Sequence, residues 1–486
     1  MLGFKSKADK VSESEHNEAR KKATDKAQEN KPWLSLKNDK RKKLGLRIQA
    51  IIGNLIFSDT EIWAYYDIPT TIYDFLSDEQ KVSYAYSLNA ALGNIVRNQN
   101  QVIDCHLYCT TSPIDVDRWE QDYLEVSKTW HHRSGFEDFI QNQIAILSSN
   151  QLFEKRCYLG VCLGKRHAID QEAINPFNVG FKEALRYGNK FLNNILLIED
   201  KSVDKDELSH AQVKERDLRT TIQKSALQGT PSTTEDLALA IKKILYPAMP
   251  CPVITLDDEN QWNQGDIIQD LSGIIGPKNP RYVKIQQLVY DKDMGEYDFR
   301  TGYHATLTFK KIPDGLNIPY MMPWIYTAVF ADVNTPFDVS CRFSLVPTEK
   351  IKKDIEKGIN QTKDAIDNAT GAGATPSPTV IDEMATATEM QREVETNKNK
   401  PWVSGTYRIG INAASEEELD NYCKAMMLYY DETMNGMKLV WTFHDQLDLL
   451  MESMPGDHLR ENSFIQTTNL ELLSVSGFNV LNEVGD

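Results

Sequence analysis

The residues that come closest to a known chemical motif are Gly160–Arg166, GVCLGKR. A phosphate-binding loop, G-x-x-x-x-G-K-[ST], holds phosphate oxygens with backbone N–H groups and a lysine, while its final hydroxyl binds Mg²⁺. Here the two glycines are one residue too close together, and Arg166 stands where the hydroxyl is needed. We therefore expect the end of a strand and a basic turn at these residues, and no nucleotide site.

Histidines and carboxylates form no recognisable catalytic pattern. His131 and His132 are adjacent, so their side chains diverge and cannot easily share one ion. His444 and Asp445 could form an acid–base pair, but an Asp at the start of a helix is also favoured by the helix dipole alone. The acidic stretch 257–260 could bind a cation, although a solvated loop is the simpler interpretation. We predict no catalytic, cofactor-binding or metal-binding residue.

The seven cysteines are scattered, and an odd number favours a reducing compartment over a disulfide framework. Cys105 and Cys109 lie in one strand-like run, and Cys157 and Cys162 lie in another. Neither pair has the two-residue spacer of common zinc sites. These residues are expected to remain thiols.

Charge is distributed unevenly along the 486 residues, whose formal net charge is −16. Such an acidic balance argues against a general binder of duplex DNA, which needs a basic surface. Residues 1–43 hold 13 Lys/Arg and 7 Asp/Glu, a net charge of +6. This composition predicts a solvated, disordered basic tail. No secretory signal or apolar run of about 20 residues is visible, so we expect a soluble chain without a membrane span.

A short aromatic strand and a capped helix are the most legible elements near the N-terminus. The strand contains Trp63–Tyr66 and should stop at Pro69, which has no N–H for a ladder. Ser77 and Gln80 have the spacing of a capping box. The following helix should pack Val82, Ala85, Leu88, Leu92 and Ile95 and expose Lys81, Ser87, Asn89 and Asn94.

Two later strands alternate clearly between two faces. In 102–111, Ile103, Cys105, Leu107 and Cys109 share one face, while Asp104, His106 and Tyr108 share the other. In 338–346, Val339, Cys341, Phe343 and Leu345 should point inward, and Asp338, Ser340, Arg342 and Ser344 outward. The second pattern predicts a half-buried antiparallel strand with one solvated face.

Helix signals recur farther along the chain. Ser232 with Glu235, and Ser415 with Glu418, are spaced as capping boxes. Two charged helical segments separated by GAGATPSPT predict a helical hairpin at 348–400 with a flexible tip.

Together these patterns predict an α+β fold: mixed α/β subdomains with largely antiparallel sheets plus a helical hairpin. The expected divisions are a basic tail (1–43), an N-terminal α/β subdomain rich in βαβ units (44–204), a second α+β subdomain (205–347), the charged hairpin (348–400) and a C-terminal βαβα subdomain (401–486).

Several stretches, taken in order, resemble one family. They are WAYYDIP with FLSDEQK, VIDCHLYCTTSPIDVDRW, CYLGVCLGKR, IPYMMPWIYTAVFADVNTPFDVSCRF and SGTYRIGINAASEEELDNYCKAM. Their order and spacing resemble the N-terminal region of the TraC/TraE-like traffic ATPases of conjugative type IV secretion in Gram-positive mobile elements. The likeness covers residues 44–486. In that family a P-loop motor domain follows, so the chain is expected to correspond to the region before the motor.

The resemblance implies docking and assembly, and no catalytic residue of the family transfers to this chain. ATP and Mg²⁺ are expected only if a motor domain follows. The implied partners are inner-membrane channel proteins and further copies of the full-length ATPase, with indirect contact to a single-stranded DNA–relaxase complex. The implied location is the cytoplasm, peripheral to the inner face of the membrane. The candidate framework or interaction residues are Trp63, Tyr65, Tyr66, Pro69, Pro323, Trp324, Asp338 and Arg342.

Two functions of other classes stay open on the sequence. A stand-alone nucleic-acid-binding accessory protein could hold a single strand with the basic tail and exposed aromatic side chains. An uncharacterised hydrolase could assemble its site from scattered carboxylates.

Overall fold

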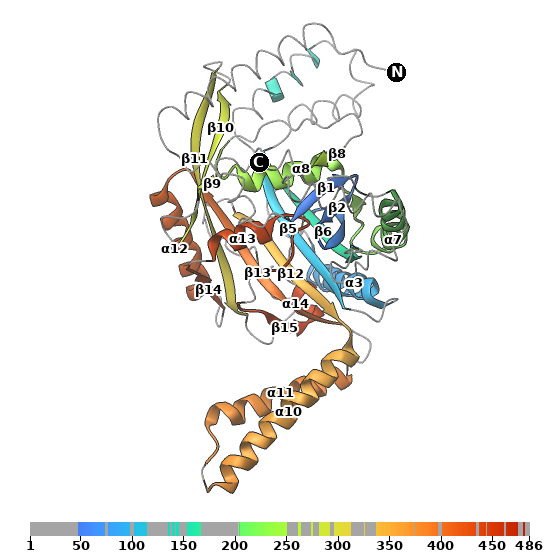
Figure 1. The fold of residues 1–486 in the computed structure, drawn as a ribbon, viewed down its shortest axis with the longest axis vertical. Coiled ribbons are helices and arrows are strands. Elements are labelled where there is room, and N and C mark those ends of the chain that lie inside the picture. Colours follow the sequence, from blue (N-terminus) through green and yellow to red (C-terminus); the bar gives the residue numbers. More distant parts are fainter. Residues whose placement is uncertain are drawn as a thin grey trace, which may run out of the picture.

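A computed structural model describes residues 47–72, 76–97, 102–113, 135–136, 139–140, 142–144, 153–166, 203, 205–249, 261–263, 274–275, 281–291, 296–312, 325, 337–373, 375–396, 401–433, 437–443, 445–460, 463–474 and 480–481. It has the α+β fold predicted from the sequence, with helices and a largely antiparallel sheet (Figure 1). Residues 114–134, which include the end of the family-like stretch VIDCHLYCTTSPIDVDRW, lie outside the described residues. The basic tail, Pro323 and Trp324 also lie outside them.

Fourteen strands of the described chain form one sheet, in which eleven follow the order β8-β1-β2-β3-β6-β5-β12-β13-β11-β10-β9. Strands β7, β14 and β15 pair beside this path. The bounds are β1 Ile48–Ile52, β2 Leu55–Ser58, β3 Glu61–Ile68, β5 Ile103–Pro113, β6 Phe153–Lys165, β7 Thr230–Pro231, β8 Gln261–Asn263, β9 Ile274–Ile275, β10 Val283–Asp291, β11 Glu296–Lys311, β12 Phe337–Val346, β13 Trp402–Ala413, β14 Lys438–Trp441 and β15 Gln466–Asn469.

Pairing within this sheet is antiparallel. Strands β3 and β5 both pair antiparallel with β6, so they run parallel to each other with β6 between them. They are joined by helix α3 (Asp78–Arg97), which makes a βαβ connection around an inserted strand. The short strands β4 (Thr71–Ile72) and β16 (Val480–Leu481) form a separate parallel pair.

Helices cover both faces of the sheet. On one face lie α3, α7 (Lys205–Gln223), α12 (Glu416–Thr433) and α14 (Leu470–Ser474), over a continuous apolar core. On the other face lie α8 (Thr234–Leu245) and α13 (Gln446–Ser453). The strands therefore carry buried side chains on both sides.

The prediction of a solvated face on 338–346 is wrong. Every residue of β12 is buried except Ser344, which is half-buried. The predicted alternation itself holds, because Val339, Cys341, Phe343 and Leu345 all lie in the apolar core. The opposite face is polar but covered by helices.

Two of the three helix N-caps predicted from the sequence are present in the structure. At α3, the Ser77 N–H donates to Gln80 Oε1 (2.8 Å) and the Gln80 N–H donates to Ser77 Oγ (3.3 Å). At α12, the Glu418 N–H donates to Ser415 Oγ (3.2 Å). The box predicted at Ser232 and Glu235 is wrong by one residue, because Thr233 and Asp236 form it.

One residue predicted to lie on the exposed face of α3 is buried. Asn89 is buried, with 6% of its surface exposed, whereas Ser87 and Asn94 are exposed as expected.

The predicted hairpin consists of α10 (Thr348–Gly371) and α11 (Pro378–Thr396), which extend away from the body (Figure 1). Strands from 44–204, 205–347 and 401–486 all join the large sheet. In the described part of the chain, no helix is both long enough and apolar enough to cross a membrane.

Candidate functional site

The largest concentration of polar chemistry lies between the sheet and helices α8 and α13. We call it the buried polar layer. Its strand residues come from β5, β11, β12 and β13, and its helix-side residues lie on or just after α13. Its members are His106, His304, Thr306, Asp338, Ser340, Arg342, Arg408, Asn412, Gln446, Glu452 and Asp457.

His106 is the centre of the first network. Its Nδ1 lies 2.9 Å from Tyr65 Oη and its Nε2 lies 3.0 Å from Ser340 Oγ. The Gly456 N–H donates to Tyr65 Oη (2.8 Å), so the tyrosine's own proton is free to donate to His106 Nδ1. The neutral ring then carries its proton on Nε2 and donates to Ser340. Burial, with the charge of Arg342, holds the pKa of His106 well below its ordinary value.

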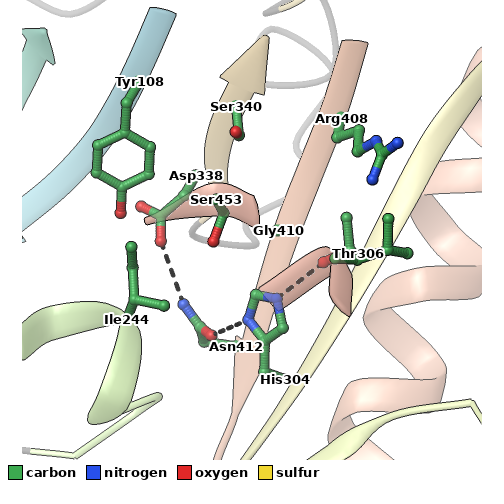
Figure 2. Close-up of a pocket in the computed structure, with 11 residues that line it drawn as sticks. Tyr108, Ile244, His304, Thr306, Asp338, Ser340, Arg408, Gly410, Asn412 and Ser453 are labelled. Atoms are coloured by element: carbon green, nitrogen blue, oxygen red, sulfur yellow. Dashed lines mark hydrogen bonds between the residues drawn. The ribbon is translucent and has the colours of Figure 1, made fainter. Parts of the chain in front are cut away.

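Asp338 and His304 form the second network (Figure 2). Asp338 Oδ1 accepts from Thr110 (2.7 Å), and its Oδ2 lies 3.4 Å from Asn412 Nδ2. Since the Asn412 amide donates to Asp338, its oxygen accepts from His304 Nδ1 (2.8 Å). His304 Nε2 then accepts from Thr306 Oγ1 (2.9 Å). Burial lowers the pKa of His304, and the Asn412 bond and Asp338 charge only partly oppose this.

Gln446 fastens α13 to strand β11. Its Oε1 accepts from the Thr306 N–H (2.7 Å), and its Nε2 donates to the Thr306 carbonyl (3.1 Å). A side-chain amide thus satisfies both backbone groups of one strand residue. Backbone N–H and carbonyl groups are costly to bury without partners, so this pairing stabilises the packing of α13 against the sheet.

Arg342 fixes the segment that leaves α13. Its Nε donates to the Glu452 carbonyl (2.9 Å), its Nη2 to the Met454 carbonyl (2.6 Å) and its Nη1 to the Asp457 carbonyl. These include carbonyls at a helix C-terminus, where a cation is favoured. The guanidinium carbon also lies 5.4 Å from the ring centroid of Trp63.

Two further arginines neutralise the carboxylates of this segment. Arg408 Nη1 lies 3.0 Å from Glu452 Oε1, with 2% and 1% of the two side chains exposed. The distance is that of an ion pair, although the angles are not those of a hydrogen bond. Arg460 Nη2 lies 2.7 Å from Asp457 Oδ2. Burial alone would raise the pKa of Asp457, but hydrogen bonds from His458 and Arg460 hold it below its ordinary value.

The space within the buried polar layer is small. A cavity of about 10 Å³ is lined by residues that include Tyr108, Asp338, Ser340 and Ser453. That volume corresponds to about one water molecule. The layer thus suits the precise seating of α13 and residues 454–460 on the sheet, and it has no room for a substrate.

A second buried carboxylate lies beneath an open groove of about 450 Å³ between the β1–β2 turn and α7. Glu215 accepts from Tyr66 Oη (3.0 Å), Asn54 Nδ2 (3.0 Å) and Arg219 (2.9 and 2.6 Å). Burial, followed by the charge of Glu215, raises the pKa of Tyr66. This carboxylate is held by its neighbours, and it anchors α7 to β3.

A third hollow, of about 430 Å³, combines aromatic and acidic side chains. The guanidinium carbon of Arg281 lies 5.6 Å from the ring centroid of Trp441 and 4.8 Å from that of Phe443. Trp441 Nε1 donates to the Arg281 carbonyl (2.6 Å). The acidic lining residues are Glu416, Glu417 and Asp420. Arg281 lines the same hollow and supplies a positive charge opposite these carboxylates.

The structure separates the candidate framework residues into distinct places. Trp63, Tyr65 and Tyr66 are buried in β3, with Tyr65 in the His106 network and Tyr66 against Glu215. Pro69 is exposed just after β3 ends at Ile68, where the sequence predicts a stop. Asp338 and Arg342 both lie in the buried polar layer, on the face where solvent was expected.

The stretch that approaches a phosphate loop forms the end of strand β6, except for Arg166, which follows the strand. Gly160 packs beneath the Tyr65 ring, and Arg166 donates to both Glu207 oxygens (2.7 and 2.8 Å). Cys105 and Cys109 lie on β5, and Cys157 and Cys162 lie on β6. All six cysteines of the described ranges are free thiols. Among those same residues, no group of three or more His, Cys, Asp or Glu side chains could hold a metal ion.

Sequence reasoning missed His304, Arg408, Glu452 and Glu215. For Arg408 a signal was available, because it lies in RIGIN, an alternating strand whose polar positions match those of β12. Glu215 gave no signal, since it lies in a helix of many exposed charges. Neither the models of known protein families nor the curated proteins compared with this chain give a match.

Proposed function

We propose that this chain is a membrane-docking and assembly domain of a conjugative type IV secretion traffic ATPase, which supports DNA transfer between bacteria. The sequence resemblance suggests this role. The observation that carries it is the α10–α11 hairpin, which projects from the sheet and leaves most of its surface uncovered (Figure 1).

Only the base of the hairpin packs against the body. Ile351, Ile355 and Val394 form a small apolar cluster with Val346 and Trp402 at the ends of β12 and β13. Apart from Thr348 at the start of α10, no described hairpin residue outside this cluster is buried, and Ile381 is 51% exposed. At 1.5 Å per residue, the 24 residues of α10 span roughly 36 Å. Such an arm is suited to contact with another protein.

The buried polar layer supplies the rigid base that an arm of this kind needs. β12 leads directly into α10, and β13 follows α11. The same two strands carry Arg342 and Arg408, which hold the segment after α13. The hairpin is therefore connected directly to two adjacent strands in the middle of the sheet. The proposed partners are inner-membrane channel proteins and neighbouring ATPase subunits, at the inner face of the membrane.

Co-purification with the detergent-solubilised inner-membrane channel proteins of a conjugation system tests this role. Ile381→Asp places a charge on the exposed hairpin and should lower recovery of the channel proteins several-fold. The matched control is Leu428→Asp on α12, since Leu428 is 56% exposed and lies on the body. The control should bind like the parent chain.

Equal recovery with both variants, or no recovery with the parent chain, would contradict the docking role. Mg²⁺-dependent ATP hydrolysis by the purified chain would favour the hydrolase alternative. Salt-sensitive binding of single-stranded DNA that is lost on removing residues 1–43 would favour the nucleic-acid-binding alternative.

A further inference from the structure

The cavity in the buried polar layer lies between the sheet and helices α8 and α13. Its volume of about 10 Å³ fits one water molecule. Figure 2 shows Tyr108, Asp338 and Ser453 directed toward the same space from β5, β12 and α13. The hydrogen-bonding groups that face it determine what it can bind.

Tyr108 contributes a hydrogen-bond donor to this cavity. Its side chain is 1% exposed, and within the described chain its hydroxyl has no partner with the geometry of a hydrogen bond, although the Thr110 side chain lies near it. Burial, with the nearby Asp338 charge, raises the pKa of Tyr108 well above its ordinary value, so the hydroxyl keeps its proton. A buried donor of this kind costs free energy unless it finds an acceptor.

Ser340 contributes a second donor. Its Oγ accepts from His106 Nε2, because the other ring nitrogen accepts from Tyr65. The serine's own proton must therefore be donated elsewhere, and the described residues provide no acceptor for it. Ser453 behaves in the opposite way, since its proton goes to the Leu450 carbonyl (2.6 Å) and its lone pairs can accept.

We propose that this cavity binds a single water molecule that accepts from Tyr108 and Ser340 and donates to Asp338 and Ser453. Water has the two lone pairs and two protons that this arrangement requires. Lys243 Nζ lies 3.4 Å from Asp338 Oδ1 and balances its charge, but a simple anion has no proton to donate to Asp338 and Ser453. An apolar atom would leave both donors unsatisfied. The water joins the His106 and His304 networks into one and connects them to α13.

Three isosteric or smaller variants test the site by urea unfolding. Tyr108→Phe and Ser340→Ala should each lower the urea midpoint, because each removes a partner of the bound water. Thr406→Val is the matched control, because the Thr406 hydroxyl is fully buried, has no hydrogen-bond partner among the described residues and does not line the cavity. Its midpoint should stay unchanged or rise.

The Tyr108→Phe/Ser340→Ala double variant should lower the urea midpoint by less than the sum of the two single decreases, since both side chains act through the same water molecule. A crystal structure of the parent chain at high resolution should show a density peak within hydrogen-bonding distance of Tyr108 Oη and Ser340 Oγ. A dry cavity, or a Tyr108→Phe midpoint that rises as in the control, would overturn the proposal.

Discussion

At the residue scale, the close packing of Gly160 against Tyr65 is the sharpest constraint. A Cβ at position 160 would lie 2.4 Å from Cζ of the Tyr65 ring, which the His106 and Gly456 contacts hold in place. Gly160→Ala should therefore destabilise the fold by roughly 1–3 kcal/mol, as overpacking of a core does. The free energy of unfolding from urea titration measures this loss.

The control for that substitution is Gly358→Ala in the middle of α10, where a Cβ would meet nothing within 4 Å. It should stabilise the chain by about 0.5–1 kcal/mol, because alanine is the better helix former. If Gly160→Ala were as harmless as Gly358→Ala, the Tyr65 ring would have to be free to move.

Which residues share a face could be predicted from the sequence, but what covers that face could not. The period of two correctly separates Val339 from Asp338, and Cys105 from His106. However, a polar strand face is predicted to be exposed to solvent unless the residues that cover it are known. The partners of Arg342 are backbone carbonyls about 110 residues away, and backbone carbonyls carry no sequence signal.

At the element scale, the start of α8 shows how pairing elsewhere moves a cap by one residue. The Ser232 N–H donates to the Tyr65 carbonyl (3.1 Å), which extends the pairing of β7 with β3. Thr233 is then the first residue free to cap, and its Oγ1 accepts from the Asp236 N–H (3.1 Å). The spacing S/T-x-x-D/E occurs twice in STTED, so local sequence alone could not choose between the two.

Replacing the two adjacent hydroxyl residues separates their roles. Thr233→Ala should cost about 1 kcal/mol of stability, the usual value of an N-cap. Ser232→Ala should cost less, since the buried Ser232 hydroxyl has no hydrogen-bond partner in the described chain. Thermal unfolding of both variants checks the difference. A larger loss of stability for Ser232→Ala would support Ser232 as the N-cap, as the sequence predicts.

At the scale of the whole molecule, the sequence specifies an α+β composition more easily than it specifies one sheet. The predicted divisions follow changes in charge and breaks in periodicity, whereas strand pairing brings distant segments together. β12 pairs with β5 and β13, which precede and follow it by more than 50 residues. Such pairings depend on tertiary packing, which local patterns do not record.

The same buried layer makes the stability of the whole molecule depend on pH. His106 and His304 have lowered pKa values, mainly because they are buried. The unfolded chain therefore binds more protons than the folded chain as the pH falls below about 6.5, the ordinary value for histidine. Stability contributed by the neutral rings is present above that pH and is lost progressively below it.

At alkaline pH the dependence has the opposite sign, so that stability decreases as the pH rises. Burial raises the pKa of Tyr65 from 10.0 to about 12 and that of Cys341 from 9.0 to about 12. The unfolded chain releases these protons first, so stability falls as the pH rises above about 9.

Urea midpoints measured from pH 5 to pH 11 should be highest between about pH 6.5 and pH 9. His106→Gln should make the acid decline shallower, because an amide does not titrate. Midpoints that stayed constant from pH 7 to pH 5 in the parent chain would show that protons reach both rings without unfolding.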